Sequence, residues 1–428
     1  MVHRTRQAVV VAAVVTLVVT SCAEPEHPRS AALPDSVTLR EVDGGADFYG
    51  RFSPSLPAGA DFFPVGLWAS SVVDDTRWPI YRASGITTYV EPTPDSDPTL
   101  VADAGMTVLS SWGDGTNGRF TADEVDMWAG PGEAAWTGRF PGDGDVCEPV
   151  TAKCGYTVLD TLASTADENA LTYGNFGKSV LFWGTDEQSR RFVNDYQDVV
   201  SADAYWFTDP NICGATEGGV LLAGGTAVPE ASCRRAENYG ATVDRVRGLV
   251  DPPGSKPVWA FVEVGRPFEN SPSSITPRDM QDAVWSSIVH GARGVVFFNH
   301  SFGGDCRSQH VLLDCDPAML EAVATTAGRL RDLAPVLAAP VADGLVVASS
   351  VDVTARYSGG DLYVLAATPR DGGRVSLELA CAPRSPIEVV GESRTVVAGP
   401  DGELEDDVPG GLHVYRTSAR ECVSEPGH

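Results

Sequence analysis

Two short apolar segments in the second half of the chain end abruptly in polar or charged residues. They are KPVWAFVEVGRPF, at 256–268, and GARGVVFFNHSF, at 291–302. The segment between them, at 276–290, has the apolar spacing of a helix. Parallel α/β sheets repeat a buried strand, a helix and a second buried strand, and polar residues gather at the carboxyl ends of their strands. This part of the chain therefore predicts a parallel sheet with Glu263 at one strand end.

The alternation of strand-like and helix-like segments extends over most of the 428 residues. The expected strands are 62–68, 85–90, 105–110, 119–126, either 170–174 or 179–183, 204–207, 258–262 and 295–298. Helical patterns lie at 75–83, 97–103, 187–200, 236–250, 276–290 and 317–333. Eight strands that alternate with helices predict a closed (β/α)8 barrel.

The pattern changes after Pro335. Short runs rich in Val, Thr and Tyr follow one another between Gly, Asp and Pro turns, and no helical pattern interrupts them. This pattern of short β-type segments and turns predicts an antiparallel β-sandwich of about 80 residues. We therefore expect a signal peptide at 1–22, a tether and N-terminal segment at 23–60, the barrel at 61–338 and the sandwich at 339–422.

The N-terminus has the features of an export signal. Arg4 and Arg6 precede an apolar stretch at 8–19 that is too short to span a bilayer comfortably. The small residues just before Cys22 resemble the lipobox of bacterial lipoproteins, in which the cysteine is lipidated and becomes the first mature residue. A plain secretory signal cleaved nearby is the alternative. We expect a chain anchored to the cell membrane through Cys22, facing the extracellular or periplasmic side, with 23–36 as a flexible tether.

Removing Cys22 from nine cysteines leaves eight, and an even number in an exported chain indicates disulfides. Spacing favours four pairs of neighbours, which are Cys147/Cys154, Cys213/Cys233, Cys306/Cys315 and Cys381/Cys422. The first three close loops after the fourth, sixth and eighth expected strands, where functional loops of a barrel emerge. Zinc is a weaker explanation, because no CxxC spacing or His cluster accompanies these residues.

Charge and motifs exclude several kinds of function. The net charge of −27 argues against nucleic acids and anionic lipid headgroups as partners, since both are negatively charged. A neutral glycan meets no such objection. The sequence also lacks the G-x-S-x-G, Walker A, H-E-x-x-H and G-x-G-x-x-G motifs. We expect no metal and no organic cofactor.

Two carboxylates follow expected strands, Glu124 after the fourth and Glu263 after the seventh. Hydrolysis of a glycosidic bond needs two carboxyl groups. The segments FPVGLW (63–68), ADEVD (122–126), PVWAFVEVGRP (257–267) and HGARGVVFFNHSF (290–302) resemble the large clan of (β/α)8-barrel glycoside hydrolases. The resemblance covers about 62–336. It implies Glu124 as acid/base, Glu263 as nucleophile and retention of configuration.

One residue departs from that clan. Asp123 stands where the clan usually has an Asn that binds the sugar 2-hydroxyl. Asp123 can accept a hydrogen bond from the same hydroxyl, and its charge should raise the pKa of Glu124. The alternative makes Asp123 the acid and Glu124 structural. Glu187 is a weaker candidate for the catalytic acid. It lies at the start of an expected helix, where acidic residues are common for structural reasons.

Other polar and aromatic residues at strand ends suit a sugar site. Indole rings stack on sugar C–H faces, although core packing also explains some tryptophans. The expected substrate-binding residues are Trp68, Glu91, Trp112, Asp123, Trp128, Trp183, Asp209, Arg266, Asn299 and His300. Together these features predict a surface-anchored glycoside hydrolase acting on a cell-envelope or extracellular polysaccharide. The alternatives are a non-catalytic carbohydrate-binding lipoprotein on the same barrel and an envelope scaffold protein.

Overall fold

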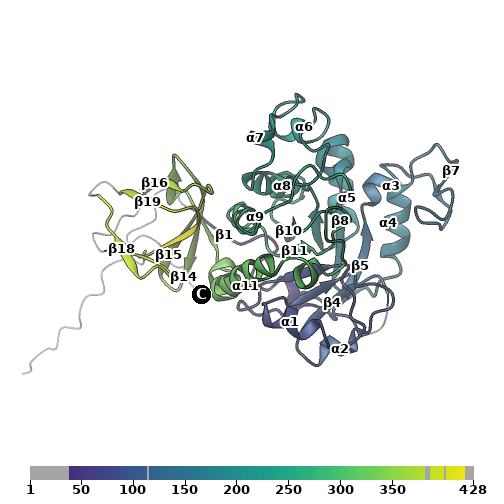
Figure 1. Cartoon of the computed structure of the whole chain (residues 1–428), viewed down its shortest axis with the longest axis horizontal. Coiled ribbons are helices and arrows are strands. Elements are labelled where there is room, and N and C mark those ends of the chain that lie inside the picture. The colour runs from purple at the N-terminus through teal and green to yellow at the C-terminus, as the bar shows by residue number, and fades with distance from the viewer. Residues whose placement is uncertain (1–37, 113–114, 381–385, 400–401, 420–428) are drawn as a thin grey trace, which may run out of the picture.

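The computed structural model describes residues 38–112, 115–380, 386–399 and 402–419, which form a closed parallel barrel joined to a β-sandwich (Figure 1). The barrel strands, in chain order, are β2 (Val65–Trp68), β3 (Thr88–Val90), β4 (Thr107–Ser110), β5 (Gly118–Asp123), β8 (Thr172–Phe176), β9 (Val199–Ala202), β10 (Val258–Glu263) and β11 (Val295–Phe298). Each pairs in parallel with the next, and β11 pairs with β2. The predicted (β/α)8 barrel followed by an antiparallel sandwich is confirmed.

Helices cover the outside of the barrel. They are α1 (Trp78–Ala83), α2 (Thr99–Ala102), α4 (Gly155–Ala163), α5 (Asp186–Asp195), α8 (Glu237–Arg247), α9 (Pro277–Val289) and α11 (Pro317–Leu337). Local sequence sets their starts. Thr185 and Gln188 form a capping box at α5, and Thr276 caps α9 ahead of a proline at its first turn. Glu187 lies in the first turn of α5, where a carboxylate complements the helix dipole.

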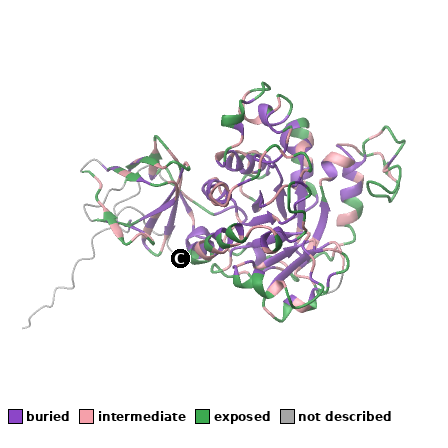
Figure 2. Cartoon of the chain, in the orientation of Figure 1, coloured by how far each residue is buried: buried purple, intermediate pink, exposed green. Residues whose placement is uncertain are grey.

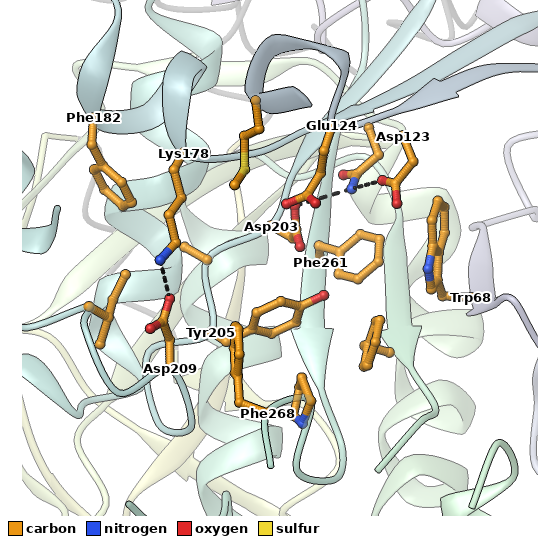
Figure 3. Close-up of a pocket in the computed structure, with 16 residues that line it drawn as sticks. Trp68, Asp123, Glu124, Lys178, Phe182, Asp203, Tyr205, Asp209, Phe261 and Phe268 are labelled. Atoms are coloured by element: carbon orange, nitrogen blue, oxygen red, sulfur yellow. Dashed lines mark hydrogen bonds and ion pairs between the residues drawn. The ribbon is translucent and has the colours of Figure 1, made fainter. Parts of the chain in front are cut away.

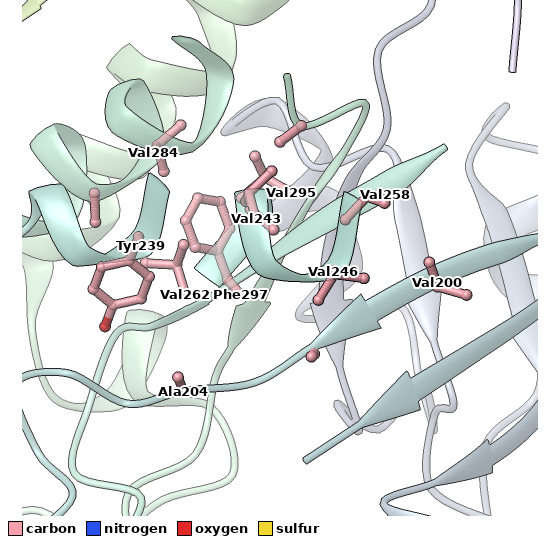
Figure 4. Packing of buried hydrophobic residues seen from close by; sticks show 14 of the residues in the cluster. Val200, Ala204, Tyr239, Val243, Val246, Val258, Val262, Val284, Val295 and Phe297 are labelled. Carbon is pink, nitrogen blue, oxygen red and sulfur yellow. The ribbon is translucent and has the colours of Figure 1, made fainter. Parts of the chain in front are cut away.

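The barrel strands are apolar on both faces because both faces are buried (Figure 2). Inward side chains such as Phe120, Tyr173 and Trp259 fill the barrel interior. The Tyr49 hydroxyl, from the short helix η1 (Phe48–Arg51), accepts a 3.0 Å hydrogen bond from the Trp259 indole. Outward side chains pack under the helices, as Val262 and other residues of the same cluster do in Figure 4.

The prediction of the sixth strand is wrong. Residues 204–207 form a loop, and the strand is β9, which begins only four residues after α5 ends. The aromatic run of this loop resembles a strand because its side chains enter the core. Trp206 is fully buried, and its indole N–H donates to the Thr242 hydroxyl over 2.9 Å. The fifth strand, β8, overlaps the first of the two predicted segments, whereas the second forms the π-helical turn η2 (Ser179–Trp183).

The sandwich contains a seven-stranded sheet in the order β1-β12-β14-β15-β20-β17-β18 and a three-stranded sheet in the order β13-β16-β19. The larger sheet comprises β1 (Thr38–Arg40), β12 (Val341–Asp343), β14 (Asp352–Ser358), β15 (Asp361–Thr368), β20 (Gly411–Ser418), β17 (Ile387–Val389) and β18 (Arg394–Val396). The smaller comprises β13 (Val346–Ala348), β16 (Gly373–Leu379) and β19 (Glu403–Val408). Strand β1 comes from the N-terminal part of the chain and pairs with β12.

The two faces of the larger sheet bury different cores. Leu362 and Val364 face the sandwich interior, whereas Leu365, Leu412 and Val414 join the hydrophobic core of the barrel. Sandwich and barrel are therefore packed through apolar side chains rather than joined by a linker alone. The predicted domain boundaries stay predictions.

Three of the predicted disulfides are confirmed. Cys147–Cys154, Cys213–Cys233 and Cys306–Cys315 have Cα–Cα distances of 5.7, 5.6 and 5.8 Å and close loops after β5, β9 and β11. Cys22, Cys381 and Cys422 lie outside the described residues. Within the described ranges, every helix is too short or too polar to cross a bilayer.

Candidate active site

A cavity of about 270 Å³ lies at the carboxyl ends of the barrel strands (Figure 3). Four carboxylates line it, and one of them, Asp209, pairs with Lys178. Asp123 is the last residue of β5, Glu124 follows it, and Asp203 follows β9. The remaining wall combines three polar residues with a larger apolar surface. These lining residues are Asn175, Lys178, Asp209, Trp68, Met127, Phe182, Ala204, Tyr205, Ile212, Phe261, Pro267, Phe268 and Phe298.

The side-chain amide of Asn175, on β8, lies between two of these carboxylates. Its Nδ2 donates to Asp123 Oδ1 over 2.9 Å and to Asp203 Oδ1 over 3.2 Å. The Ser201 hydroxyl donates to Asn175 Oδ1 over 2.5 Å, which fixes the orientation of the amide. Because one nitrogen contacts both acids, Asp123 and Asp203 are held close together above the strand that separates them.

Glu124 has an unusual backbone. Its φ of 46° and ψ of 33° lie in the left-handed region, which costs a non-glycine residue of order 1 kcal/mol and is often found at functional sites. The Glu124 N–H donates to the Asn175 carbonyl over 3.0 Å, and its own carbonyl accepts from Met127 N over 2.8 Å. A Cβ on Gly177 would lie 2.6 Å from Glu124 Oε1, so this glycine leaves the space that the carboxyl group occupies.

The pKa values of the other three acids, Asp123, Glu124 and Asp203, are all raised. The charge of Asp203, then burial, then the charge of Asp123 raise the pKa of Glu124. Burial, followed by the charge of Asp203, raises the pKa of Asp123. Burial also raises the pKa of Asp203, but hydrogen bonds from Tyr205 and Asn175 and the charge of Lys178 limit that rise.

These environments favour different protonation states. Three buried acids in one cavity cannot all be ionised at neutral pH. The Asn175 amide donates a hydrogen bond to Asp203, whereas no described residue donates one to the carboxyl group of Glu124. The arrangement therefore favours a protonated Glu124 beside an ionised Asp203, which is the pattern of an acid paired with a charged partner.

Lys178 links the loops that follow β8 and β9. Its Nζ lies 2.6 Å from Asp209 Oδ2 and 2.8 Å from Glu217 Oε2. Burial by itself would lower the pKa of Lys178, but hydrogen bonds to these two carboxylates outweigh it and raise that pKa. Lys178 therefore brings a fixed positive charge to the cavity and keeps Asp209 in its wall.

Of the residues predicted from the sequence, four line this cavity: Trp68, Asp123, Glu124 and Asp209. Glu263 does not. Its side chain is fully buried, and its Oε1 accepts from Phe207 N over 2.8 Å and from the Tyr239 hydroxyl over 2.7 Å. Its Oε2 accepts from the Thr208 hydroxyl. Glu263 thus fastens residues 207–208 of the loop after β9 to α8, a position that does not support its predicted role as nucleophile.

Several other predicted ligands make internal hydrogen bonds outside the cavity wall. Glu91 accepts from Ser111 N over 2.6 Å. Asn299 is fully buried and donates to the Tyr81 hydroxyl over 2.8 Å. His300 Nε2 lies 3.1 Å from the carbonyl of Ala69.

The remaining predicted ligands also lie outside the cavity lining. The Trp128 indole donates to the Asp123 carbonyl over 2.7 Å and so contacts the backbone of that residue. The Trp112 indole donates to the Pro92 carbonyl over 3.3 Å. Trp183 is 51% exposed. The Arg266 N–H donates to the Ser301 hydroxyl over 3.2 Å.

Four lining residues are not predicted from the sequence: Asp203, Asn175, Lys178 and Tyr205. The signal for Asp203 was present, because it follows the apolar run VVSA as Glu124 follows its own strand. With the sixth strand expected at 204–207, Asp203 would precede the strand and lie at the opposite end of the barrel from the site. Asn175 and Tyr205 carry no distinctive local pattern, and their roles depend on contacts across neighbouring strands.

The chain is similar in structure to glycoside hydrolases. One solved glycoside hydrolase is 13% identical over 89% of this chain and 96% of its own, with a TM-score of 0.49. A glycoside hydrolase family 5 protein from Bacteroides vulgatus is 13% identical over 88% of this chain and 93% of its own, also at 0.49. An alpha-amylase from Anoxybacillus is 10% identical over 85% of this chain and 99% of its own, with a TM-score of 0.47. No protein-family model and no curated protein sequence matches the chain.

Proposed function

We propose that this protein is a glycoside hydrolase whose active site is the cavity lined by Asp123, Glu124 and Asp203. One observation carries the proposal. Three carboxylates converge at the barrel mouth in surroundings that favour a proton on Glu124 and a negative charge on Asp203. Glycosidic hydrolysis requires a proton donor and a second carboxylate on opposite sides of the scissile bond.

In the proposed reaction, Glu124 gives its proton to the leaving glycosidic oxygen while an Asp203 oxygen bonds to the anomeric carbon. Glu124, now ionised, then takes a proton from water, whose oxygen displaces Asp203 and restores both residues. Retention of configuration follows from these two displacements. Asp203 has the largest influence on the Glu124 pKa, and a retaining site would place the two carboxyl groups about 5–5.5 Å apart.

The other lining residues suit a neutral sugar. Asp123 is placed to accept a sugar hydroxyl, and Trp68, Phe261, Phe268 and Phe298 supply faces on which a sugar ring can stack. The net charge of −27 favours a neutral glycan over an anionic one. The proposed substrate is accordingly a polysaccharide of the cell envelope or the surroundings, such as an arabinan or a galactan.

A substrate screen tests this proposal. The purified protein is incubated with a panel of neutral polysaccharides, and new reducing ends are measured together with the anomer released, by NMR. Cleavage that disappears when Asp203 is replaced by Asn supports the proposal. Saturable binding of a glycan without cleavage would instead favour a non-catalytic carbohydrate-binding protein on the same barrel.

We further propose that the protein is held at the cell membrane by lipid on Cys22. Replacing Cys22 with Ala should move the protein from the membrane fraction to the soluble one, because a lipid anchor contributes about 0.8 kcal/mol for each buried CH₂ group. Fractionation and immunoblotting measure the distribution, and Cys22→Ser provides a second variant. Membrane retention equal to that of the wild type would count against the anchor.

A further inference from the structure

A second cavity, of about 190 Å³, lies where the N-terminal segment, the barrel and the sandwich meet. It shares no lining residue with the proposed active site. Four arginines line it: Arg40 on β1, Arg247 at the end of α8, Arg293 before β11 and Arg356 on β14. Such a concentration of positive charge is unexpected in a chain whose net charge is −27.

Arg356 lacks a partner for its charge. Its neighbours on β14, Ala355 and Tyr357, enter the sandwich core, so alternation along the strand directs Arg356 to the opposite face, toward the barrel. The residue is only 3% exposed, and its Nε is buried without a hydrogen bond. Among the described residues, no carboxylate forms an ion pair with it. Burial, with the nearby charge of Arg293, lowers the pKa of Arg356 to about 9.

Arg293 is in a similar position on the barrel side. Its Nη1 donates to the Leu337 carbonyl over 3.1 Å, and no carboxylate among the described residues forms an ion pair with it. Burial lowers its pKa as well. The cavity is thus bordered by two guanidinium groups, one from each part of the molecule, of which Arg356 is buried and Arg293 half-buried.

The acidic residues of the cavity are already engaged by other cations. Asp43 accepts from Arg247 Nε over 2.5 Å and Nη2 over 3.1 Å, and its Oδ1 lies 3.4 Å from Arg40 Nη1. Asp343 pairs with Arg40 at 2.9 Å. Asp244 pairs with His290 at 2.7 Å. Among the described residues, these pairs leave Arg293 and Arg356 without a carboxylate in direct contact, and a buried charge without a close partner is costly.

We propose that this cavity binds a small tetrahedral oxyanion of the phosphate class between Arg293 and Arg356. Guanidinium groups match phosphate oxygens in pairs of parallel hydrogen bonds, and the cavity, at about 190 Å³, has room for such an anion. Because the two arginines belong to the barrel and the sandwich, the bound anion also fixes one part against the other.

Isothermal titration of the full chain with inorganic phosphate, at constant ionic strength in chloride, tests the proposal. Saturable binding of one phosphate per chain is expected. Arg356→Gln should weaken it about tenfold or more, since a charge-assisted hydrogen bond contributes about 1.5–3 kcal/mol. The control is Arg331→Gln, whose side chain on α11 is 69% exposed, and it should bind as the wild type does.

A second variant and a second ligand complete the test. Arg293→Gln should also lose affinity, which keeps the proposal testable if Arg356→Gln does not fold. Binding of phosphate alone identifies a site for the free anion, whereas binding of methyl phosphate as well identifies one that accepts phosphate esters; both support the proposal. Absence of saturable binding by the wild type, or unchanged affinity in the folded arginine variants, would overturn it.

Discussion

Replacing Asp203 with Asn should lower kcat on any cleaved glycan by about a thousandfold or more. The amide has nearly the same shape as the carboxylate and leaves the cavity filled, but it cannot bond to the anomeric carbon as a carboxylate does. Affinity for the glycan should change little, because the lost interaction belongs to the transition state rather than to the bound substrate. Reducing-end release gives kcat, and titration of the inactive variant gives the dissociation constant.

Glu124→Gln separates the acid from the nucleophile. This variant should fail on natural glycans, whose leaving groups need a proton, and should retain partial activity on aryl glycosides, whose leaving groups do not. The control is Glu187→Gln, because Glu187 is an exposed carboxylate at the start of α5.

Activity within about tenfold of the wild type in Asp203→Asn would show that Asp203 is not the nucleophile.

The pH profile of the same enzyme has a predicted direction. Activity requires an ionised Asp203 and a protonated Glu124, and both pKa values are raised, so both limbs of the profile should lie above the ordinary carboxyl range. The negative charge of Asp123 contributes to the raised pKa of Glu124. Asp123→Asn should therefore move the alkaline limb to lower pH.

Replacing Glu263 with Ala should lower the free energy of unfolding by about 3 kcal/mol. The change removes the acceptor of three hydrogen bonds and leaves Phe207 N and the Tyr239 hydroxyl buried without partners. Glu263→Gln should cost less, because its Oε1 can still accept from both groups. Urea unfolding followed by tryptophan fluorescence measures the difference.

Stability should also depend on pH through Glu263. Burial raises its pKa from 4.5 to about 7, so the folded state binds this proton more tightly than the unfolded state does. Its contribution to stability is fully present below about pH 4.5 and is lost as pH rises through about 7. Glu263→Gln should lack this dependence. A Glu263→Gln protein of normal stability and negligible turnover would instead favour Glu263 as the nucleophile.

Much of the barrel could be predicted because each buried parallel strand is a short apolar run that ends in a polar residue. The rule succeeded for β2, β10 and β11, where turns separate strand from helix clearly. It failed at β9, because the aromatic loop after it is as apolar as a strand. Trp206 is buried by loop packing rather than by sheet pairing, and hydrophobicity alone does not distinguish the two.

The site was harder to predict than the fold. Position at a strand end placed Asp123 and Glu124 correctly in the cavity wall. The same reasoning for Glu263 could not anticipate that Tyr239, on α8, and the loop at 207–208 would engage its carboxylate. Those partners are 24 and 56 residues away in the sequence, so their contacts follow from the tertiary arrangement and leave no local pattern.

The pairing of β1 with β12 affects how the chain must assemble during synthesis. The Arg40–Asp343 contact spans 303 residues, so β1 leaves the ribosome long before its partner strand exists. The whole barrel is made in the interval, and the larger sheet of the sandwich gains this edge only afterwards. Closing so long a loop late is slow, and an unpaired strand can meanwhile pair with other chains. A chaperone that shields the N-terminal segment until β12 is available would therefore protect this protein from such pairing.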